Sequence, residues 1–154
     1  MQQFFTVAKA GIGAVVGIAV LAYGHAVFTD WYLLIAPFGA SAVLLFGVPD
    51  SPLAQPLNVI GGHVLTATIG LLFASFVGVC PWSLALATGT AVSVMMLTST
   101  LHPPAGANPI LVMLSRLDWD FVFDPVLVGA VLIVAVAKVY RKLSRSAPAI
   151  NKPE

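Results

Sequence analysis

Long uninterrupted apolar stretches alternate along the chain with short polar breaks. No Asp, Glu, Lys or Arg occurs within residues 10–29, 31–49, 51–115 or 125–137. A helix that crosses a bilayer needs about 20 apolar residues, and the apolar positions here run on without the alternation typical of a membrane barrel. Because lipid accepts only helices or closed barrels, the pattern predicts an all-α membrane protein.

Four of the apolar stretches are predicted to be transmembrane helices. They cover residues 8–28, 57–79, 82–101 and 125–143. The last begins with a proline, which suits the first turn of a helix. Residues 1–147 are therefore predicted to form a single transmembrane domain, followed by a short polar tail at 148–154.

Two further apolar segments are interrupted by proline and glycine. Residues 31–47 are broken at Pro37-Phe38-Gly39, and residues 102–117 are broken at Pro103-Pro104-Ala105-Gly106. Proline removes a backbone donor and glycine loosens a helix, and irregular backbone at membrane depth needs protein or water around it. We expect two re-entrant segments that dip into the membrane from outside. The alternative is that both segments cross, which would give six crossings and an inverted repeat.

The two broken segments share one sequence pattern. Residues 37–44 and 104–111 both follow Pro-x-Gly-Ala-(Ser/Asn)-x-(Val/Ile)-Leu, and each copy lies between two long apolar stretches. The shared position of the pattern predicts a two-fold internal repeat, with one unit at about 8–79 and the other at about 82–143.

Each copy of the pattern contains a polar residue that is expected to begin a short helix near the membrane centre. Asn108 before Pro109 is typical of an N-cap, and Ser41 is a weaker example. Free N–H groups and the helix dipole favour anions at such ends, and transporters with discontinuous helices use them for substrate. The predicted binding positions are Gly39, Ala40, Ser41, Gly106, Ala107 and Asn108.

Two histidines, His63 and His102, lie within the long uncharged stretch at 51–115. Ionisable side chains inside a membrane are costly and are therefore candidates for function. Either ring can donate to an anion or pass a proton near neutral pH, so both are added to the predicted substrate site. The alternative is a neutral ring whose hydrogen bonds are satisfied by a backbone carbonyl.

Composition narrows the class of function. Hydrophobic residues make up 59% of the chain and charged residues 8%, against about 25% charged residues in soluble domains. No carboxylate lies at membrane depth beside a histidine, and the histidines lack metal-ligand spacing. We therefore expect neither an enzyme nor a cofactor or metal, and the few basic residues do not favour nucleic acid as a partner. The expected partners are the lipid bilayer and, because the bundle is small, further copies of the chain in a homo-oligomer.

Basic residues near the two ends of the chain predict its orientation. They are Lys9, Lys138, Arg141, Lys142 and Arg145. Positive residues stay on the cytoplasmic side of a membrane, so both termini are expected there. No transit peptide is evident, and the expected location is the inner (plasma) membrane of a bacterium.

The stretch from Leu101 to Pro109, Leu-His-Pro-Pro-Ala-Gly-Ala-Asn-Pro, resembles the signature of the HPP family of integral membrane proteins. Residues 37–46 and 51–56 resemble two further typical stretches of that family, and Asn58, Gly61, Gly62 and His63 follow them. The resemblance covers about residues 4–143. It implies a four-helix membrane protein, and it links the chain to plant chloroplast and cyanobacterial members that are associated with nitrite transport.

These observations together predict a transporter or channel for a small monovalent anion, with nitrite or a similar oxyanion as the leading candidate. The anion would lie between two half-helix N-termini near the midplane, where binding must be weak enough for release. One alternative is a non-transporting scaffold that binds a partner protein. Another is a carrier of a different small solute.

Overall fold

The computed structural model describes residues 1–27 and 33–146 of the chain, and these form an all-α bundle without a strand. The six α-helices are α1 (Gln2–Val27), α2 (Ala36–Ala42), α3 (Pro56–Phe76), α4 (Pro81–Leu97), α5 (Asn108–Ser115) and α6 (Val128–Ser146). The shorter helical turns are η1 (Val43–Gly47), η2 (Pro52–Ala54), η3 (Pro103–Ala107), η4 (Trp119–Val122) and η5 (Phe123–Leu127). The predicted class is therefore confirmed, whereas the predicted tail at 148–154 lies outside the described residues.

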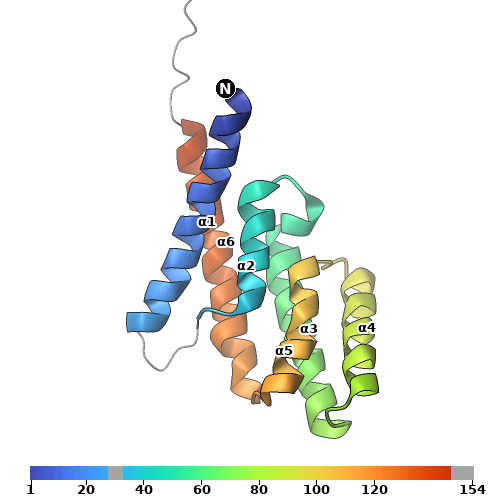
Figure 1. Ribbon diagram of the computed structural model, residues 1–154. Helices are drawn as coiled ribbons and strands as arrows, with labels where there is room; N and C mark the ends of the chain where they lie inside the picture. The colour runs from blue at the N-terminus through green and yellow to red at the C-terminus, as the bar shows by residue number, and fades with distance from the viewer. Residues whose placement is uncertain (28–32, 147–154) are drawn as a thin grey trace, which may run out of the picture.

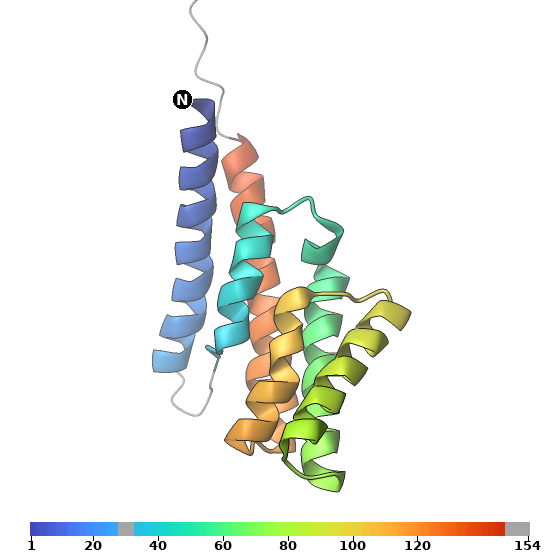
Figure 2. The same cartoon turned by 45° about the vertical axis from the view of Figure 1, so that its right-hand side comes forward.

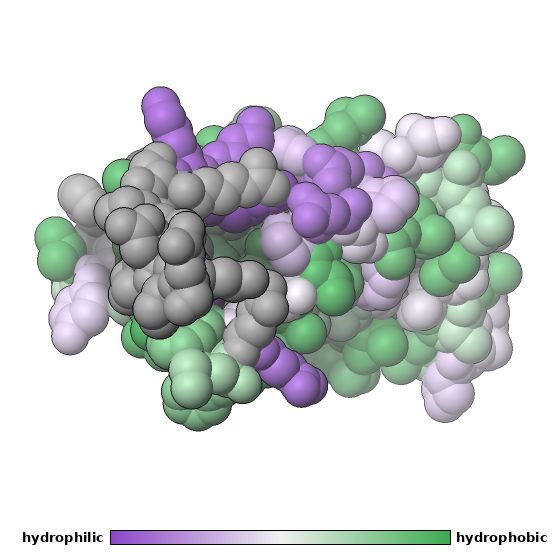
Figure 3. Space-filling model, turned by 90° about the horizontal axis from the view of Figure 1, so that it is seen from above, coloured by the Kyte–Doolittle hydropathy of each residue, from purple (hydrophilic) through white to green (hydrophobic). Residues whose placement is uncertain are grey.

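Three helical stretches are long and apolar enough to cross a membrane. They are Gln3–Val27, Pro56–Phe76 and Trp119–Ser144. Their outward faces carry large exposed apolar side chains, such as Val15, Tyr23 and Val131, as expected of a bundle surrounded by lipid. Figure 3 views the molecule from the end at which α1 begins. Hydrophilic residues (purple) gather in part of this face, and hydrophobic residues (green) occupy much of the edge of the molecule.

The chain runs alternately up and down through the bundle (Figures 1 and 2). α1 descends from the N-terminus, α2 rises, α3 descends, α4 rises, α5 descends and α6 rises. Each broken segment therefore starts towards one end of the bundle and leaves towards the other, without turning back. The expected re-entrant arrangement is not confirmed. The alternative of six crossings is not confirmed either, because α5 has only 8 residues and, among the described residues, three helical stretches are long enough to span.

The third predicted span is shorter than expected. α4 ends at Leu97 and has 17 residues, a rise of about 26 Å at 1.5 Å per residue, less than the hydrocarbon thickness of about 30 Å. Ser99 takes a left-handed conformation with φ 57°, and the N–H of Thr100 returns to the carbonyl of Met95 at 2.9 Å. This turn ends the helix at Leu97, although the sequence predicted that it would continue to residue 101.

The proline breaks lie at helix starts. α2 begins at Ala36 with Pro37 in its first turn, where the missing N–H has no helical partner to lose. Pro103–Ala107 forms the 3-10 turn η3, which runs directly into α5. The breaks therefore shorten these two helices instead of opening irregular backbone in their middle.

Small residues let the helices approach closely. A Cβ atom on Gly70 of α3 would lie 2.8 Å from the Cα of Pro109 in α5. One on Gly17 of α1 would lie 2.8 Å from the ring of Phe46 in η1. The core accordingly has two apolar clusters, one joining α1, α2 and α6 around Phe38 and the other joining α3, α5 and η5. The polar residues described next lie among these helices.

Candidate functional site

Four of the predicted site residues meet in the interior of the bundle. Ser41 comes from α2, His63 from α3, His102 from the residue before η3, and Asn108 from the start of α5. Each is 0% exposed. Residues from both broken segments therefore come together around one histidine of α3, which the sequence predicted as a single site without fixing its geometry.

A continuous chain of hydrogen bonds links the four side chains. The ring of His102 lies 2.8 Å from the carbonyl of Leu53 through Nδ1 and 2.8 Å from Ser41 Oγ through Nε2. Ser41 Oγ lies 2.8 Å from His63 Nε2, and Asn108 Nδ2 lies 3.0 Å from His63 Nδ1. One serine hydroxyl thus bridges two histidine rings.

The two ends of this chain assign the proton positions. The carbonyl of Leu53 can only accept, so a neutral His102 carries its proton on Nδ1 and accepts at Nε2 from the Ser41 hydroxyl. Asn108 Nδ2 can only donate, so His63 accepts at Nδ1 and donates from Nε2 to Ser41 Oγ. Both neutral tautomers follow from the network, and every bond in the chain runs in the same direction.

A second acceptor lies beside the serine. The hydroxyl of Ser41 is 3.2 Å from the carbonyl oxygen of Pro37, one turn earlier in α2. If a proton binds His102 Nε2, the ring becomes a donor to Ser41 Oγ, and the hydroxyl can turn to Pro37. The site can therefore take up one proton at His102 without leaving the serine hydroxyl unpaired.

The amide of Asn108 anchors α5 to α3. Its Nδ2 also lies 3.1 Å from the carbonyl oxygen of His63 and 3.0 Å from Thr66 Oγ1, so its two N–H groups are shared among three acceptors. Asn108 Oδ1 is buried and has no hydrogen-bond partner among the described residues. An unpaired buried acceptor is costly, so this oxygen is a place where a ligand that donates a hydrogen bond would gain free energy.

Packing holds the two rings in place. The rings of Phe38 and His63 have centroids 5.0 Å apart, and those of His63 and His102 are 5.1 Å apart, both in edge-to-face arrangements. Gly62 makes room for His102, because a Cβ at Gly62 would lie 2.9 Å from the Cβ of His102. The glycine before His63 is thus what lets the second histidine come so close to α3.

The predicted N-caps are wrong. Asn108 has helical φ and ψ of −61° and −44°, and it follows a turn that is already helical. Ser41 is the sixth residue of α2, and its hydroxyl points to the cluster and back to Pro37. Neither side chain caps a helix, because α2 begins at Ala36, well before Ser41, and the helical turn η3 directly precedes Asn108. The cluster therefore presents side-chain groups, whereas the N-cap positions are Ile35 for α2 and Ala107 for α5.

The four small residues of the predicted site lie elsewhere. Gly39, Ala40 and Ala107 are exposed and Gly106 is half-buried, so none joins the buried cluster. Ala40 and Ala107 line a surface groove of about 560 Å³ between the two broken segments. The lining residues are Ala36, Pro37, Ala40, Leu44, Pro103, Pro104, Ala107 and Leu111.

The groove lining follows the shared sequence pattern of the two broken segments. Six of its eight residues form three pairs that are equivalent in the shared sequence pattern: Pro37 with Pro104, Ala40 with Ala107, and Leu44 with Leu111. The other two, Ala36 and Pro103, directly precede the pattern in each copy. The next residue after each alanine of the pattern, Ser41 or Asn108, turns into the buried cluster. The two copies of the pattern therefore face each other, with the groove on one side and the polar cluster inside.

Thr66 and the carbonyl of Leu53 belong to the cluster although the sequence did not single them out as site residues. Thr66 lies three residues after His63 on the same helix, a spacing that brings side chains to one face and was available as a signal. The Leu53 carbonyl had none. No charged side chain takes part in these hydrogen bonds, and within the described residues no three His, Cys, Asp or Glu side chains gather to hold a metal ion.

Comparison with known proteins agrees with the resemblance in the motifs. The chain matches the family described as "HPP, transmembrane region" over residues 1–148. A transmembrane protein of Dictyostelium discoideum is 40% identical over 144 residues, covering 84% of this chain and 49% of that protein. A second from the same organism is 34% identical over 145 residues, covering 87% of this chain and 47% of that protein. The chain spans about half the length of these curated relatives, and no solved structure matches it.

Proposed function

Because the chain belongs to the HPP transmembrane-region family, and is thus an integral membrane protein that crosses the bilayer more than once, we propose that it moves a small monovalent anion across the membrane. Nitrite or a similar oxyanion is the leading candidate, on the family resemblance. The curated relatives are named only as transmembrane proteins and add no substrate. In this proposal the protein is a transporter or channel and not an enzyme.

The observation that carries the proposal is the buried hydrogen-bond chain from Asn108 through His63 and Ser41 to His102. Polar and ionisable groups at membrane depth cost free energy and are rarely kept without a use. The hydrogen-bond chain contains two imidazole rings and a serine hydroxyl that can donate to either of two acceptors. In this proposal these three groups accept and return a proton, and no permanently charged side chain takes part in the network.

A proton at this site makes anion entry less costly. A lone anion in a low-dielectric interior carries a large desolvation penalty, whereas an anion beside a protonated histidine forms a pair with no net charge. We infer that the proton on His102 and the anion enter together. The anion then displaces two acceptors: it takes the Nε2–H of His102 in place of Ser41 Oγ, and the Ser41 hydroxyl in place of the Pro37 carbonyl. The binding centre is therefore the side-chain cluster.

The groove between the broken segments gives this proposal an approach route. It is lined by apolar and small residues directly beside Ser41 and Asn108. A homo-oligomer in which a second copy covers the groove would separate it from lipid.

The basic residues at one end of the bundle favour cytoplasmic termini. The bacterial inner membrane stays a prediction.

The direct test is nitrite uptake into proteoliposomes that contain the purified protein, with and without a pH gradient. Ser41→Ala removes the hydroxyl that bridges the rings, and Thr68→Ala is the matched control. The Thr68 hydroxyl donates to Val64 O of its own helix at 2.8 Å and takes no part in the cluster. We expect uptake that depends on the gradient, is lost by about tenfold or more in Ser41→Ala, and is kept in Thr68→Ala.

Other outcomes would reject the proposal. If folded protein takes up none of nitrite, nitrate, formate or chloride, the chain is not an anion transporter and the scaffold alternative takes first place. If uptake is unaffected by Ser41→Ala, the buried cluster is a structural network and the anion passes elsewhere. Uptake that is independent of the gradient and intact in His102→Gln would remove the proton from the mechanism.

A further inference from the structure

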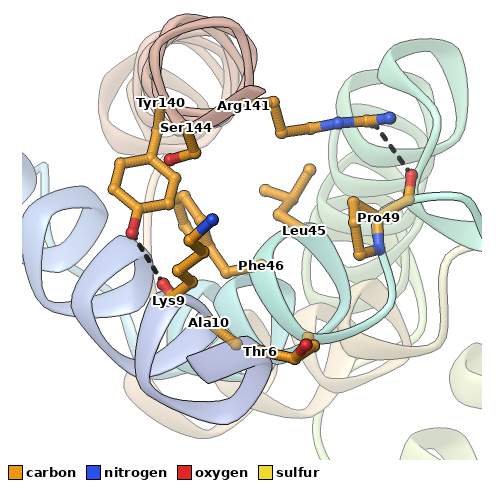
Figure 4. Close-up of a pocket in the computed structure, with 10 residues that line it drawn as sticks. Thr6, Lys9, Ala10, Leu45, Phe46, Pro49, Tyr140, Arg141 and Ser144 are labelled. Carbon is orange, nitrogen blue, oxygen red and sulfur yellow. Dashed lines mark hydrogen bonds between the residues drawn. The ribbon is translucent and has the colours of Figure 1, made fainter. Parts of the chain in front are cut away.

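A second polar site lies at the end of the bundle where α1 begins and α6 ends. It is a pocket of about 240 Å³ between α1, α6 and the end of the α2–η1 segment. Its lining residues are Thr6, Lys9, Ala10, Leu45, Phe46, Gly47, Pro49, Tyr140, Arg141 and Ser144. Figure 4 shows that they surround one open space. None of them belongs to the cluster assigned to transport.

Two cations face this pocket from different helices. The amine of Lys9 points into the space between Tyr140 and Phe46 (Figure 4), and among the described residues it has no hydrogen-bond or ion-pair partner. Arg141 lies on the opposite wall, where Nη1 donates to the carbonyl of Pro49 at 3.1 Å and Nη2 contacts Asp50 Oδ1 at 2.8 Å. The guanidinium is thus held in one orientation, while the lysine is free to engage a ligand.

Asp50 compensates the charge of Arg141 from outside the pocket. Its side chain is 82% exposed, and it contacts Arg141 Nη2 at 2.8 Å. Asp50 is also not among the residues that line the space. The positive charge left at the pocket is therefore that of Lys9, while Arg141 contributes guanidinium N–H groups to the wall.

Hydroxyl groups and an apolar floor complete the site. Tyr140 donates its hydroxyl to the carbonyl of Lys9 at 2.8 Å, which fixes α6 against α1, and the side chain of Ser144 lies one turn further along α6. Leu45 and Phe46 form a buried floor at 5% and 7% exposure. Cations and hydroxyls at the rim above apolar side chains match a molecule with an anionic head and an apolar body.

We propose that this pocket binds the phosphate group of an anionic phospholipid. The pocket lies where α1 begins and α6 ends. The first part of α1 contains Lys9, and the last part of α6 contains Lys138, Arg141 and Lys142, so this end is expected in the cytoplasmic leaflet. That leaflet contains anionic lipids, and basic pockets between transmembrane helices bind their head groups. A free phosphate ion would use the cations but would gain nothing from the floor of Leu45 and Phe46, so the lipid is the better match.

Competition between two lipids tests the site without any transport assay. The purified protein is mixed with equal amounts of phosphatidylglycerol and phosphatidylcholine, and the lipid that it retains is measured by native mass spectrometry. We expect a preference for phosphatidylglycerol that falls by about fivefold in Lys9→Gln and is kept in Lys9→Arg. Lys142→Gln is the matched control, because it removes one positive charge from an exposed position of α6 that does not line the pocket.

Three results would overturn the assignment. An equal loss in Lys9→Gln and Lys142→Gln would mean that general surface charge, and not the pocket, attracts the lipid. No preference in the wild-type protein would remove the lipid altogether. In phosphatidylcholine nanodiscs, stabilisation by inorganic phosphate that Lys9→Gln abolishes would assign the pocket to a soluble anion. The conservative Lys9→Arg variant keeps the test valid if the glutamine variant folds poorly.

Discussion

The pair of adjacent glycines at 61 and 62 offers a sharp test of how the polar cluster is built. A methyl group added at Gly62 would meet the Cβ of His102 and the carbonyl oxygen of Thr100, both at 2.9 Å. Carbon atoms in contact prefer about 3.5–4.0 Å, so the His102 segment must retreat by about 0.6–1 Å. The two atoms in contact are a backbone carbonyl oxygen and a Cβ atom, and neither can move away by a side-chain rotation.

The magnitude follows from this displacement. Overpacking of this kind costs about 1–3 kcal/mol. A retreat of His102 also stretches its two 2.8 Å hydrogen bonds to Leu53 and Ser41, each contributing about 1 kcal/mol. Alanine gains about 1 kcal/mol over glycine in helix propensity. We therefore expect Gly62→Ala to lower the free energy of unfolding by about 2–4 kcal/mol.

Gly61→Ala is the matched control. The same methyl group there meets the Cγ2 atom of Thr100 at 3.0 Å, the end of a side chain that can turn away. The propensity gain then dominates, and the substitution should be neutral or stabilising by up to about 1 kcal/mol. Reversible unfolding in mixed micelles with increasing sodium dodecyl sulfate, followed by circular dichroism, measures both variants. Equal unfolding free energies for the two would refute the close approach of His102 to α3.

The remaining predictions concern three other contacts. Ser41→Ala leaves one donor and one acceptor of the two histidines unpaired, so unfolding should become easier by about 1–3 kcal/mol; an unchanged midpoint in the same assay would contradict the hydrogen-bond chain. Gly70→Ala places a methyl group 2.8 Å from the Cα of Pro109 and should cost about 1–3 kcal/mol, seen as a lower thermal midpoint; a higher midpoint would disprove the α3–α5 contact. Hydrogen bonds with Ser83 lower the pKa of the Cys80 thiol at the turn before α4. Ser83→Ala should therefore raise that pKa and slow alkylation by iodoacetamide near neutral pH, and equal alkylation rates would argue against this bond.

Two substitutions of His102 distinguish its proposed proton role from its packing role. Replacing His102 by glutamine keeps a donor and an acceptor but cannot hold a proton, whereas replacing it by alanine also opens a cavity. The two variants therefore separate the proposed proton role from the packing role of the ring. The same reasoning applies to His63, whose ring lies between Phe38 and His102.

The amino-acid sequence by itself determined the class of protein and most of the polar site. The long uncharged runs require helices in lipid, because neither loops nor open sheets satisfy their backbone there. Ser41, His63, His102 and Asn108 stood out because polar groups inside such runs must find partners in the folded protein. The repeated Pro-x-Gly-Ala pattern also indicated that the two broken segments play equivalent parts, and their residues line the groove in equivalent pairs.

Only the tertiary structure decided the direction of the broken segments, the length of α4 and the way the polar groups pair. Proline and glycine mark where a helix is weak, but they do not say whether the helix starts at that point or breaks there. The packing of the second broken segment on α3 decides between these possibilities. His102 lies against Gly62 and Pro109 lies against Gly70, at distances that leave no room for a Cβ on either glycine. Hydrogen-bond partners such as the Leu53 carbonyl are likewise set by which backbones meet in space. Local sequence carries no signal for them, because every residue has a carbonyl and only the fold selects the one that a histidine reaches.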